Sequence, residues 1–251
     1  MREEKCVYWM VAHHKKDPFL EISKKFFHPI QVGKAIAQED LGIEGDDKGD
    51  NISHMNKQFC ELTAYYYAWK NRLEEFEYIG LMHYRRIFVK SWIPKRIITL
   101  NKQNLEKKIA KSKTFIENKL AEYEVVLPRK IKFGNITIRQ QYADSHFVED
   151  FDNVMKLVVE KEPKMAPIVE KFTHSNSMYA FNMLIARRDI FADYCEWLFD
   201  ILFEFEKRFY TPKNDPYQDR IFGFLAERLL NIYFSYRKPK IYECPVGFIN
   251  F

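Results

Sequence analysis

An apolar run that passes directly into basic side chains is the feature that most constrains the fold of this chain. Residues 78–82 lead into His83-Tyr84-Arg85-Arg86, and the earlier apolar run 6–12 leads into His13-His14-Lys15-Lys16. An amphipathic helix is predicted between these two strand candidates, and residues 51–53 form a cap before it. The apolar residues of this helix recur every three or four positions: Met55, Phe59, Leu62, Tyr66 and Trp69. The order strand, connection, helix, strand predicts parallel neighbours in an α/β sheet.

Parallel neighbours would bring both basic clusters to one edge of the sheet, the edge where open α/β folds bind their ligands. The guanidinium group of arginine is a fixed fork of donors that matches phosphate oxygens, so Arg85 and Arg86 together suit a diphosphate. The predicted ligand of such a crevice is a nucleotide diphosphate. The same pattern also fits a strand end whose arginines are solvated or paired with surface carboxylates. Arg187 and Arg188 are expected at the exposed start of a later helix, outside the site.

The rest of the chain continues to alternate between strand and helix candidates. Residues 90–121 form a lysine-rich excursion with one exposed helix, and its charge fits a solvated face or, as the alternative, a membrane surface. We therefore predict a single compact α/β domain over 1–251, with a mixed, mostly parallel sheet flanked by helices. The other predicted elements are strands at 123–127 and 181–186 and helices at 151–159, about 190–205 and about 217–234.

Composition narrows the classes of function. The 8 glycines include no GxGxxG or Walker pattern, which argues against a glycine-rich phosphate loop. The net charge of +5 fits an anionic partner such as a nucleotide, phospholipid headgroups or nucleic acid. Four cysteines without CxxC spacing indicate reduced thiols in the cytoplasm, and residues 1–5 with the short run after them indicate no signal peptide. No uninterrupted apolar stretch reaches spanning length, so we expect no membrane crossing.

Patterns for metal binding are weak. His13 and His14 are adjacent, and the sequence holds neither HExxH nor His-x-His spacing. Asp46, Asp47 and Asp50 resemble a carboxylate cluster, but the spacing of a calcium loop is absent and a lysine interrupts the run. A solvated acidic loop is the better interpretation, and we predict no resident metal.

Two later segments carry candidate acids and bases. Asp144 and His146 are close in sequence, but adjacent residues seldom face one another and no GxSxG elbow occurs, so a catalytic triad is not indicated. Asp219 lies near the start of a predicted helix, where the dipole keeps a carboxylate ionised. Glu227 follows Gly223 by four residues, so the two share a helix face and the glycine leaves room beside the carboxylate. The presence of these residues can also be explained without a catalytic function, by helix capping and exposed ion pairs.

Several sequence blocks together resemble those of one known family. They are His14-Lys15, 29–33, 45–53, Asn56, Glu61-Leu62-Thr63, 78–86, Asn182-Met183 and 220–228. These blocks cover nearly the whole chain, and their combination is highly specific. The chain resembles the "domain of unknown function" family of capsule and exopolysaccharide loci, some of whose members are galactofuranosyltransferases.

The resemblance implies a GT-A-like glycosyltransferase. It implies a nucleotide-diphosphate sugar donor, UDP-linked and carrying galactofuranose in some members, and a glycan acceptor that is lipid-linked. GT-A enzymes usually hold a metal with an Asp-x-Asp motif after a central strand, where this chain has His83-Tyr84-Arg85-Arg86. We therefore expect cationic side chains to replace the metal in stabilising the leaving diphosphate, in an inverting transfer without a cofactor.

The resemblance also suggests roles for individual residues. A carboxylate or histidine must accept the proton of the acceptor hydroxyl, with Asp219 the first choice and Glu227, His146 and Asp144 the others. The residues expected to contact the donor or its diphosphate are His14, Lys15, Asn51, Ser53, Asn56, His83, Tyr84, Arg85, Arg86, Asn182, Arg220 and Arg228.

Two other functions fit parts of the sequence. A non-catalytic nucleic-acid-binding module would explain the basic balance and the aromatic content, although no RNA-recognition or helix-turn-helix signature occurs and we expect no nucleic-acid partner. A nucleotide-sugar hydrolase or phosphotransferase would use the same diphosphate site. The expected location is the cytoplasm, either free or peripheral on the inner face of the membrane.

Overall fold

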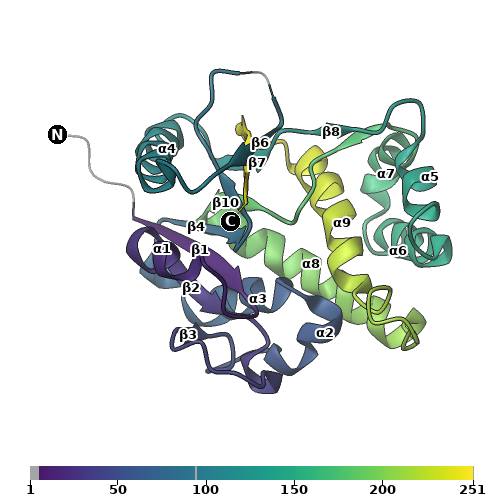
Figure 1. The fold of residues 1–251 in the computed structure, drawn as a ribbon. Helices are drawn as coiled ribbons and strands as arrows, with labels where there is room; N and C mark the ends of the chain where they lie inside the picture. Colours follow the sequence, from purple (N-terminus) through teal and green to yellow (C-terminus); the bar gives the residue numbers. More distant parts are fainter. Residues whose placement is uncertain (1–5, 94, 251) are drawn as a thin grey trace.

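A ten-stranded mixed sheet is the framework of the molecule (Figure 1). The computed structural model describes residues 6–93 and 95–250; the expectation of no signal peptide rests partly on residues 1–5, which lie outside the described residues. The strands of the main path, from one edge to the other, are β11 (Ile241–Cys244), β7 (Val125–Pro128), β10 (Leu184–Arg187), β4 (Tyr78–His83), β1 (Val7–His13), β2 (His28–Gln31) and β3 (Glu44–Gly45).

The two strands that end in basic clusters are parallel neighbours. In the β1–β4 register Val7 lies opposite Tyr78 and Ala12 opposite His83, so the ends of both strands meet at one edge. Along the main path only β10 runs against its described neighbours β4 and β7. The predicted α/β class and the mostly parallel mixed sheet are therefore confirmed.

A small platform extends the sheet beyond β4. It consists of β5 (Arg86–Phe88), β12 (Val246–Ile249) and β6 (Ile97–Leu100), with β12 antiparallel to β5 and parallel to β6. A separate short pair is formed by β8 (Ile131–Lys132) and β9 (Ser177–Met178). Because β5 starts at Arg86, the chain turns straight from the β4 edge into this platform.

Helices cover both faces of the sheet (Figure 1). Side chains alternate along β1: Tyr8, Met10 and Ala12 belong to one core and Val7, Trp9 and Val11 to the other. The helices are α1 (Leu20–Phe26), α2 (Asn56–Phe59), α3 (Leu62–Asn71), α4 (Leu105–Leu120), α5 (Ile138–Ala143), α6 (Val148–Lys161), α7 (Ala166–Thr173), α8 (Arg188–Phe209) and α9 (Ile221–Arg237). Within the described residues none of them is both long and apolar enough to cross a bilayer.

The helix predicted up to Trp69 is in fact two helices. Cys60 has a positive φ of 53°, a conformation that an α-helix cannot contain, and it separates α2 from α3. Periodicity predicted one helix because the apolar residues on both sides of Cys60 still face the same core. The break matters for function, since it turns the start of α3 toward the β4 edge of the sheet.

Other sequence expectations need smaller corrections. The connection after β1 contains α1 and β2, which the sequence patterns did not predict. The predicted strand at 181–186 begins only at Leu184, because Phe181 and Asn182 have positive φ values and form a turn. The basic excursion 90–121 contains both β6 and α4. The helix is exposed on one face only, because it buries Leu105, Ile109, Ile116 and Leu120 in the core.

The expected solvated acidic loop is wrong for Asp46, which is fully buried. Its carboxylate accepts the backbone N–H groups of Gly33 at 2.8 Å and Lys34 at 3.1 Å, and it also accepts a short hydrogen bond from the Ser53 hydroxyl. Asp46 therefore ties two loops together. Its neighbour Asp50 is exposed.

We expect Asp46→Ala to lower the free energy of unfolding by about 3 kcal/mol, because three buried donors lose their acceptor. The exposed Asp50→Ala serves as a matched control and should change the stability by less than about 1 kcal/mol. Guanidinium denaturation at neutral pH measures both. Equal losses in the two variants would show that Asp46 does not hold the loops.

Candidate functional site

A cleft opens where β1 and β4 end, at the edge predicted from the sequence. Its outer chamber has a volume of about 510 Å³, within the range of small-molecule sites. The chain elements that meet there are the ends of β1 and β4, the start of β5, the α2–α3 break and the residue before α9. The lining residues are Ala12, His14, Val32, Asn56, Lys57, Cys60, Glu61, His83, Tyr84, Arg85, Arg86 and Arg220.

A smaller inner pocket of about 70 Å³ adjoins this chamber. The two share Cys60, Glu61, His83, Arg86 and Arg220. The inner pocket is completed by residues of the β10 turn and of α9: Phe181, Gly223, Phe224 and Glu227. Gly223 and Glu227 thus face one pocket together, as their spacing predicted.

Glu61 enters the cleft because of the unusual backbone at Cys60. Its side chain accepts a hydrogen bond from the Asn182 amide at 2.8 Å, and the same amide donates to the Gly223 carbonyl at 2.9 Å. A side chain at Gly223 would approach Cys60 Sγ to 3.3 Å, so α2 and α9 pack closely here. Asn182 is therefore a positioning residue that links α3 to α9.

Glu227 is the inner carboxylate. Its Oε1 accepts the Phe181 N–H at 3.0 Å, and its Oε2 lies 3.2 Å from the Arg228 guanidinium. Burial raises the pKa of the Glu227 carboxyl, and the nearby Glu61 adds to this, whereas Arg228 and Arg86 act against it. A raised pKa makes this carboxylate a stronger base than an exposed glutamate.

His83 is neutral at physiological pH in this setting. Burial lowers its pKa, and Nε2 lies 2.6 Å from the Phe181 carbonyl oxygen. Because a carbonyl only accepts, Nε2 carries the proton and Nδ1 keeps its lone pair. Phe181 therefore connects the two groups: its N–H binds Glu227 and its carbonyl binds His83.

The arginines of the cleft differ from most of the other arginines in having no carboxylate partner among the described residues. In the part of the chain that the structure describes, Arg85, Arg86 and Arg220 form no ion pair with a carboxylate, whereas Arg139, for example, binds Asp152 with two hydrogen bonds. Arg86 lies 4.7 Å from the ring of Phe181 and 5.1 Å from that of Phe248, and its buried Nε has no hydrogen-bond partner. Arg220 donates to Cys60 Sγ at 3.2 Å. These cations are placed to bind an anion that enters from solvent.

Cys60 does not supply a nucleophile. Burial, reinforced by the charge of Glu61, raises the pKa of its thiol to about 12. The thiol is therefore protonated at physiological pH, and the thiolate is the reactive form. Its role is to shape the backbone and to contact Arg220.

The structure brings together about half of the residues predicted to bind the donor. His14, Asn56, His83, Tyr84, Arg85, Arg86 and Arg220 line the outer chamber. Five others do not line either cavity: Lys15, Asn51, Ser53, Asn182 and Arg228.

The polar groups of four of these five residues are used inside the protein. Asn51 bonds within its own loop, to the carbonyls of Asp47 and Gly49, and Ser53 binds the buried Asp46. The almost fully buried Arg228 binds the Gln141 side chain at 2.7 Å as well as Glu227. Arg228 therefore positions the inner carboxylate, as Asn182 positions Glu61.

The candidate bases are also separated by the structure. Among the four, only Glu227 lines a cavity. Asp219 lies outside and accepts hydrogen bonds from Gln58, Tyr210 and the Lys213 N–H. Asp144 is exposed and bonded to Gln140, and His146 stacks on Phe224 and bonds to Gln218.

Glu61, Lys57 and Phe181 were missed as site residues in the sequence. Glu61 appeared there only as part of a family block, Glu61-Leu62-Thr63. Its signal was weak because a glutamate next to an amphipathic helix normally lies on the solvated face. Only the positive φ of Cys60 directs it into the cleft.

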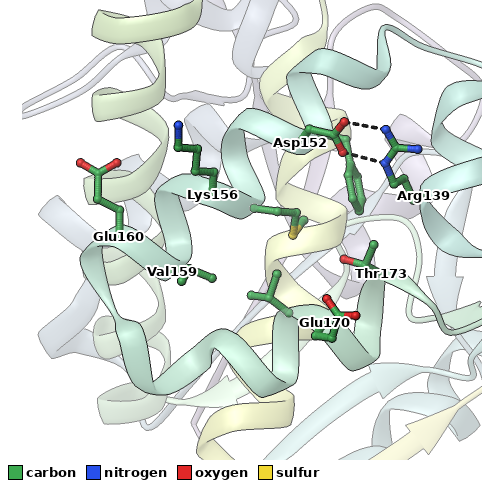
Figure 2. A pocket seen from close by; sticks show the side chains of 10 residues that line it. Arg139, Asp152, Lys156, Val159, Glu160, Glu170 and Thr173 are labelled. Atoms are coloured by element: carbon green, nitrogen blue, oxygen red, sulfur yellow. Dashed lines mark hydrogen bonds and ion pairs between the residues drawn. The ribbon is translucent and has the colours of Figure 1, made fainter.

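A second hollow lies on the helical side of the molecule, away from the sheet edge. It has about 520 Å³, lies over α5, α6 and α7, and is widely open (Figure 2). Arg139 and Asp152 pair with each other at one side of it through two hydrogen bonds (Figure 2). Three carboxylates, those of Asp152, Glu160 and Glu170, line this hollow against two cations, Arg139 and Lys156, so it is a poorer anion site than the cleft. Within 6–93 and 95–250, His, Cys, Asp and Glu side chains nowhere form a group of three suited to a metal ion.

Fold and site together define a class: a mixed α/β protein with a cleft at the carboxyl edge of its sheet, where three arginines without an ion pair among the described residues share the cleft with two carboxylates. The sequence matches the model of the "Domain of unknown function (DUF4422)" family over residues 9–238, and the chain belongs to this family.

A solved structure, the apo form of the WbbM bifunctional glycosyltransferase, is similar to nearly the whole chain. The likeness has a TM-score of 0.88 with 29% sequence identity and covers 99% of this chain and 46% of that one. The chain thus spans less than half the length of this relative. Comparison with curated proteins gave no significant match.

Proposed function

We propose that this protein is a glycosyltransferase that moves a sugar from a nucleotide-diphosphate donor to a hydroxyl group of a glycan acceptor. The observation that carries the proposal is the meeting of Arg85, Arg86 and Arg220 with Glu61 and Glu227 in one cleft, with no ion pair from these arginines to any carboxylate of the described residues. The similarity to a bifunctional glycosyltransferase over 99% of this chain supports it. Cations for a leaving diphosphate and a carboxylate base are the two groups that such a transfer needs.

In the proposed reaction the diphosphate lies in the outer chamber against the three arginines. The bond between the anomeric carbon and the phosphate oxygen breaks, and the diphosphate leaves with the electron pair. The arginines stabilise its growing negative charge, the part that a divalent cation has in other transferases. The aromatic rings beside Arg86 hold its guanidinium group in place before the donor binds.

The acceptor hydroxyl forms the new bond to the anomeric carbon on the face opposite the diphosphate, so the transfer inverts the configuration. We place Glu227 as the base that takes the hydroxyl proton, in preference to Asp219, because Glu227 lines the inner pocket and its pKa is raised. Glu61 and His83 line the same pocket, and the Glu61 carboxylate and the free Nδ1 lone pair of His83 can accept hydrogen bonds from sugar hydroxyls.

The finer identity of the substrates follows from the family resemblance. We propose a GT-A-like enzyme that uses a UDP-linked donor, with galactofuranose as the first sugar to test. The acceptor would be a lipid-linked glycan of capsule, exopolysaccharide or O-antigen synthesis, and the work would be done at the cytoplasmic face of the membrane.

The test is a panel of nucleotide sugars, first by thermal shift and then by product analysis. A true donor at about 100 times its Kd should stabilise the protein by about 2.7 kcal/mol, which for a chain of this size raises Tm by roughly 5–10 °C. Transfer to an added glycan should persist in EDTA. Release of free sugar regardless of acceptor would instead identify a hydrolase, and loss of transfer in EDTA with rescue by manganese would contradict the arginine site.

A further inference from the structure

The segment between β5 and β6, with the first residue of β6, exposes large apolar side chains to solvent. Trp92 is 88% exposed, Ile93 55% and Ile97 40%, whereas the other three tryptophans are buried or partly buried. Together with Val89, Ile98 and Leu100 the first two line an open hollow of about 420 Å³. The segment projects from the top of the molecule, beside α4 (Figure 1).

Hydrogen bonds hold this exposed segment in its shape. The Arg129 guanidinium donates to the carbonyls of both Ile93 and Lys95 at 3.0 Å, and the Lys90 N–H binds the Ser112 hydroxyl on α4 at 3.0 Å. The Ile93 N–H also binds the Ser91 hydroxyl. These bonds tie Lys90, Ile93 and Lys95 to α4 and to the residue after β7, so the exposed apolar side chains beside them are held by described backbone contacts.

The surroundings of the apolar group are strongly cationic. Between residues 78 and 116 the sequence has one acidic residue, Glu106, which pairs with Lys25 at 2.9 Å. The same stretch has ten lysines and arginines. Those exposed around the apolar side chains are Lys90, Lys95, Arg96, Lys102, Lys107, Lys108 and Lys111.

We propose that Trp92, Ile93 and Ile97, with the lysine face of α4, form a docking surface for the anionic surface of a lipid bilayer. An exposed tryptophan beside aliphatic residues, surrounded by long cationic side chains, is the composition of surfaces that lie in a membrane interface. An acidic protein could satisfy the lysines, but the solvent-facing indole favours a lipid interface, where tryptophan is enriched.

Docking in this way would hold the catalytic cleft close to the bilayer. Arg86 lines the cleft and starts β5, and Lys90 follows it by four residues, at most about 14 Å along the chain. A lipid-linked acceptor would therefore reach the cleft without leaving the membrane. The docking surface itself does not depend on the transfer reaction, so its test can fail or succeed independently of the proposed function.

The test is co-sedimentation of the full chain with vesicles of phosphatidylcholine, with or without phosphatidylglycerol. We expect binding to the vesicles that contain phosphatidylglycerol, weakened by salt, and little binding to phosphatidylcholine alone. Trp92→Ser and Lys107→Glu/Lys111→Glu should each lower the partition coefficient about tenfold or more. Because the altered side chains are exposed, thermal unfolding of both variants should match that of the parent protein.

The matched control is Lys164→Glu/Lys171→Glu, which makes the same change of charge at exposed positions near α7. It should bind vesicles nearly as well as the parent protein. Equal weakening by both charge variants would show diffuse attraction and overturn the proposed surface. Failure to bind phosphatidylglycerol vesicles would also overturn the proposed surface. If the parent protein then bound polyglutamate and the Trp92→Ser variant did not, the surface would be assigned to an acidic protein instead.

Discussion

Replacing Glu227 by glutamine is expected to lower kcat for sugar transfer by roughly 10²–10⁴-fold, the contribution of a positioned general base. The donor Kd should change by less than about threefold, because the arginines of the cleft remain. Glutamine keeps the acceptor for the Phe181 N–H, so the inner pocket should keep its shape. Single-turnover assays with saturating donor, together with donor titration, measure the two effects separately.

The control for this prediction is Asp219→Asn. Asp219 was the first choice from the sequence, but it lies outside the cavities and its oxygens accept three hydrogen bonds. We expect this variant to retain transfer at the parent rate per folded molecule, even if its stability falls. Loss of turnover in Asp219→Asn, with turnover retained in Glu227→Gln, would reverse the assignment of the base.

The pH dependence of the proposed transfer by the parent protein gives a second measure of Glu227. Only the deprotonated carboxylate accepts a proton, so kcat/KM should rise with pH through the pKa of this group. Because burial raises that pKa, the rise should be centred above the ordinary glutamate value of about 4.3. The effect of Glu227 on the stability of the fold has the opposite sign. The folded state favours the protonated carboxyl group, so the free energy of unfolding falls as pH rises from the pKa of Glu227 in the unfolded chain through its pKa in the folded protein.

Removal of the Arg86 side chain has the second largest expected effect. Arg86→Ala should lower kcat/KM by roughly 10²–10³-fold, the size found when one preorganised donor to a developing anion is lost. Arg86→Lys should restore little, because lysine lacks the planar fork that packs against the rings of Phe181 and Phe248. Steady-state kinetics and inhibition by the nucleoside diphosphate product measure the loss.

Arg188→Ala is the matched control for this substitution. Arg188 starts α8 at the surface and pairs with Glu74 at 3.1 Å, far from the cleft in the fold. Its removal should change kcat/KM by less than about threefold. Similar losses from the two substitutions would mean that the diphosphate is not bound by Arg86.

The sequence was a good guide to elements with a strong local pattern. The continuous apolar runs before His13 and His83 predicted β1 and β4, and the helical spacing of buried residues predicted α8 and α9. Each pattern extends over a single helix or strand. It therefore predicts which face of that element is buried but not which other element covers that face. The parallel arrangement of β1 and β4 could be predicted because a helix lies between them, which a tight hairpin would not allow.

Residues whose role depends on distant partners were less predictable. Ser53 and Asn51 looked like donor contacts, but Asp46 and the loop carbonyls use their polar groups. Arg228 looked like a phosphate ligand, and its burial beside Glu227 makes it a positioning residue. In each case the competing partner lies elsewhere in the chain, and a short sequence window holds no information on it.

The sequence by itself determined the α/β class and placed cations at the ends of two neighbouring strands, because periodicity and strand order are local properties of a chain. Only the tertiary structure decided which carboxylates face those cations. Glu61 enters the cleft through the positive φ of Cys60, and Glu227 through the packing of Gly223 on α9 against Cys60. The physical reason is that a side chain takes its neighbours from the packing of whole helices and strands, which depends on contacts between residues far apart in the sequence.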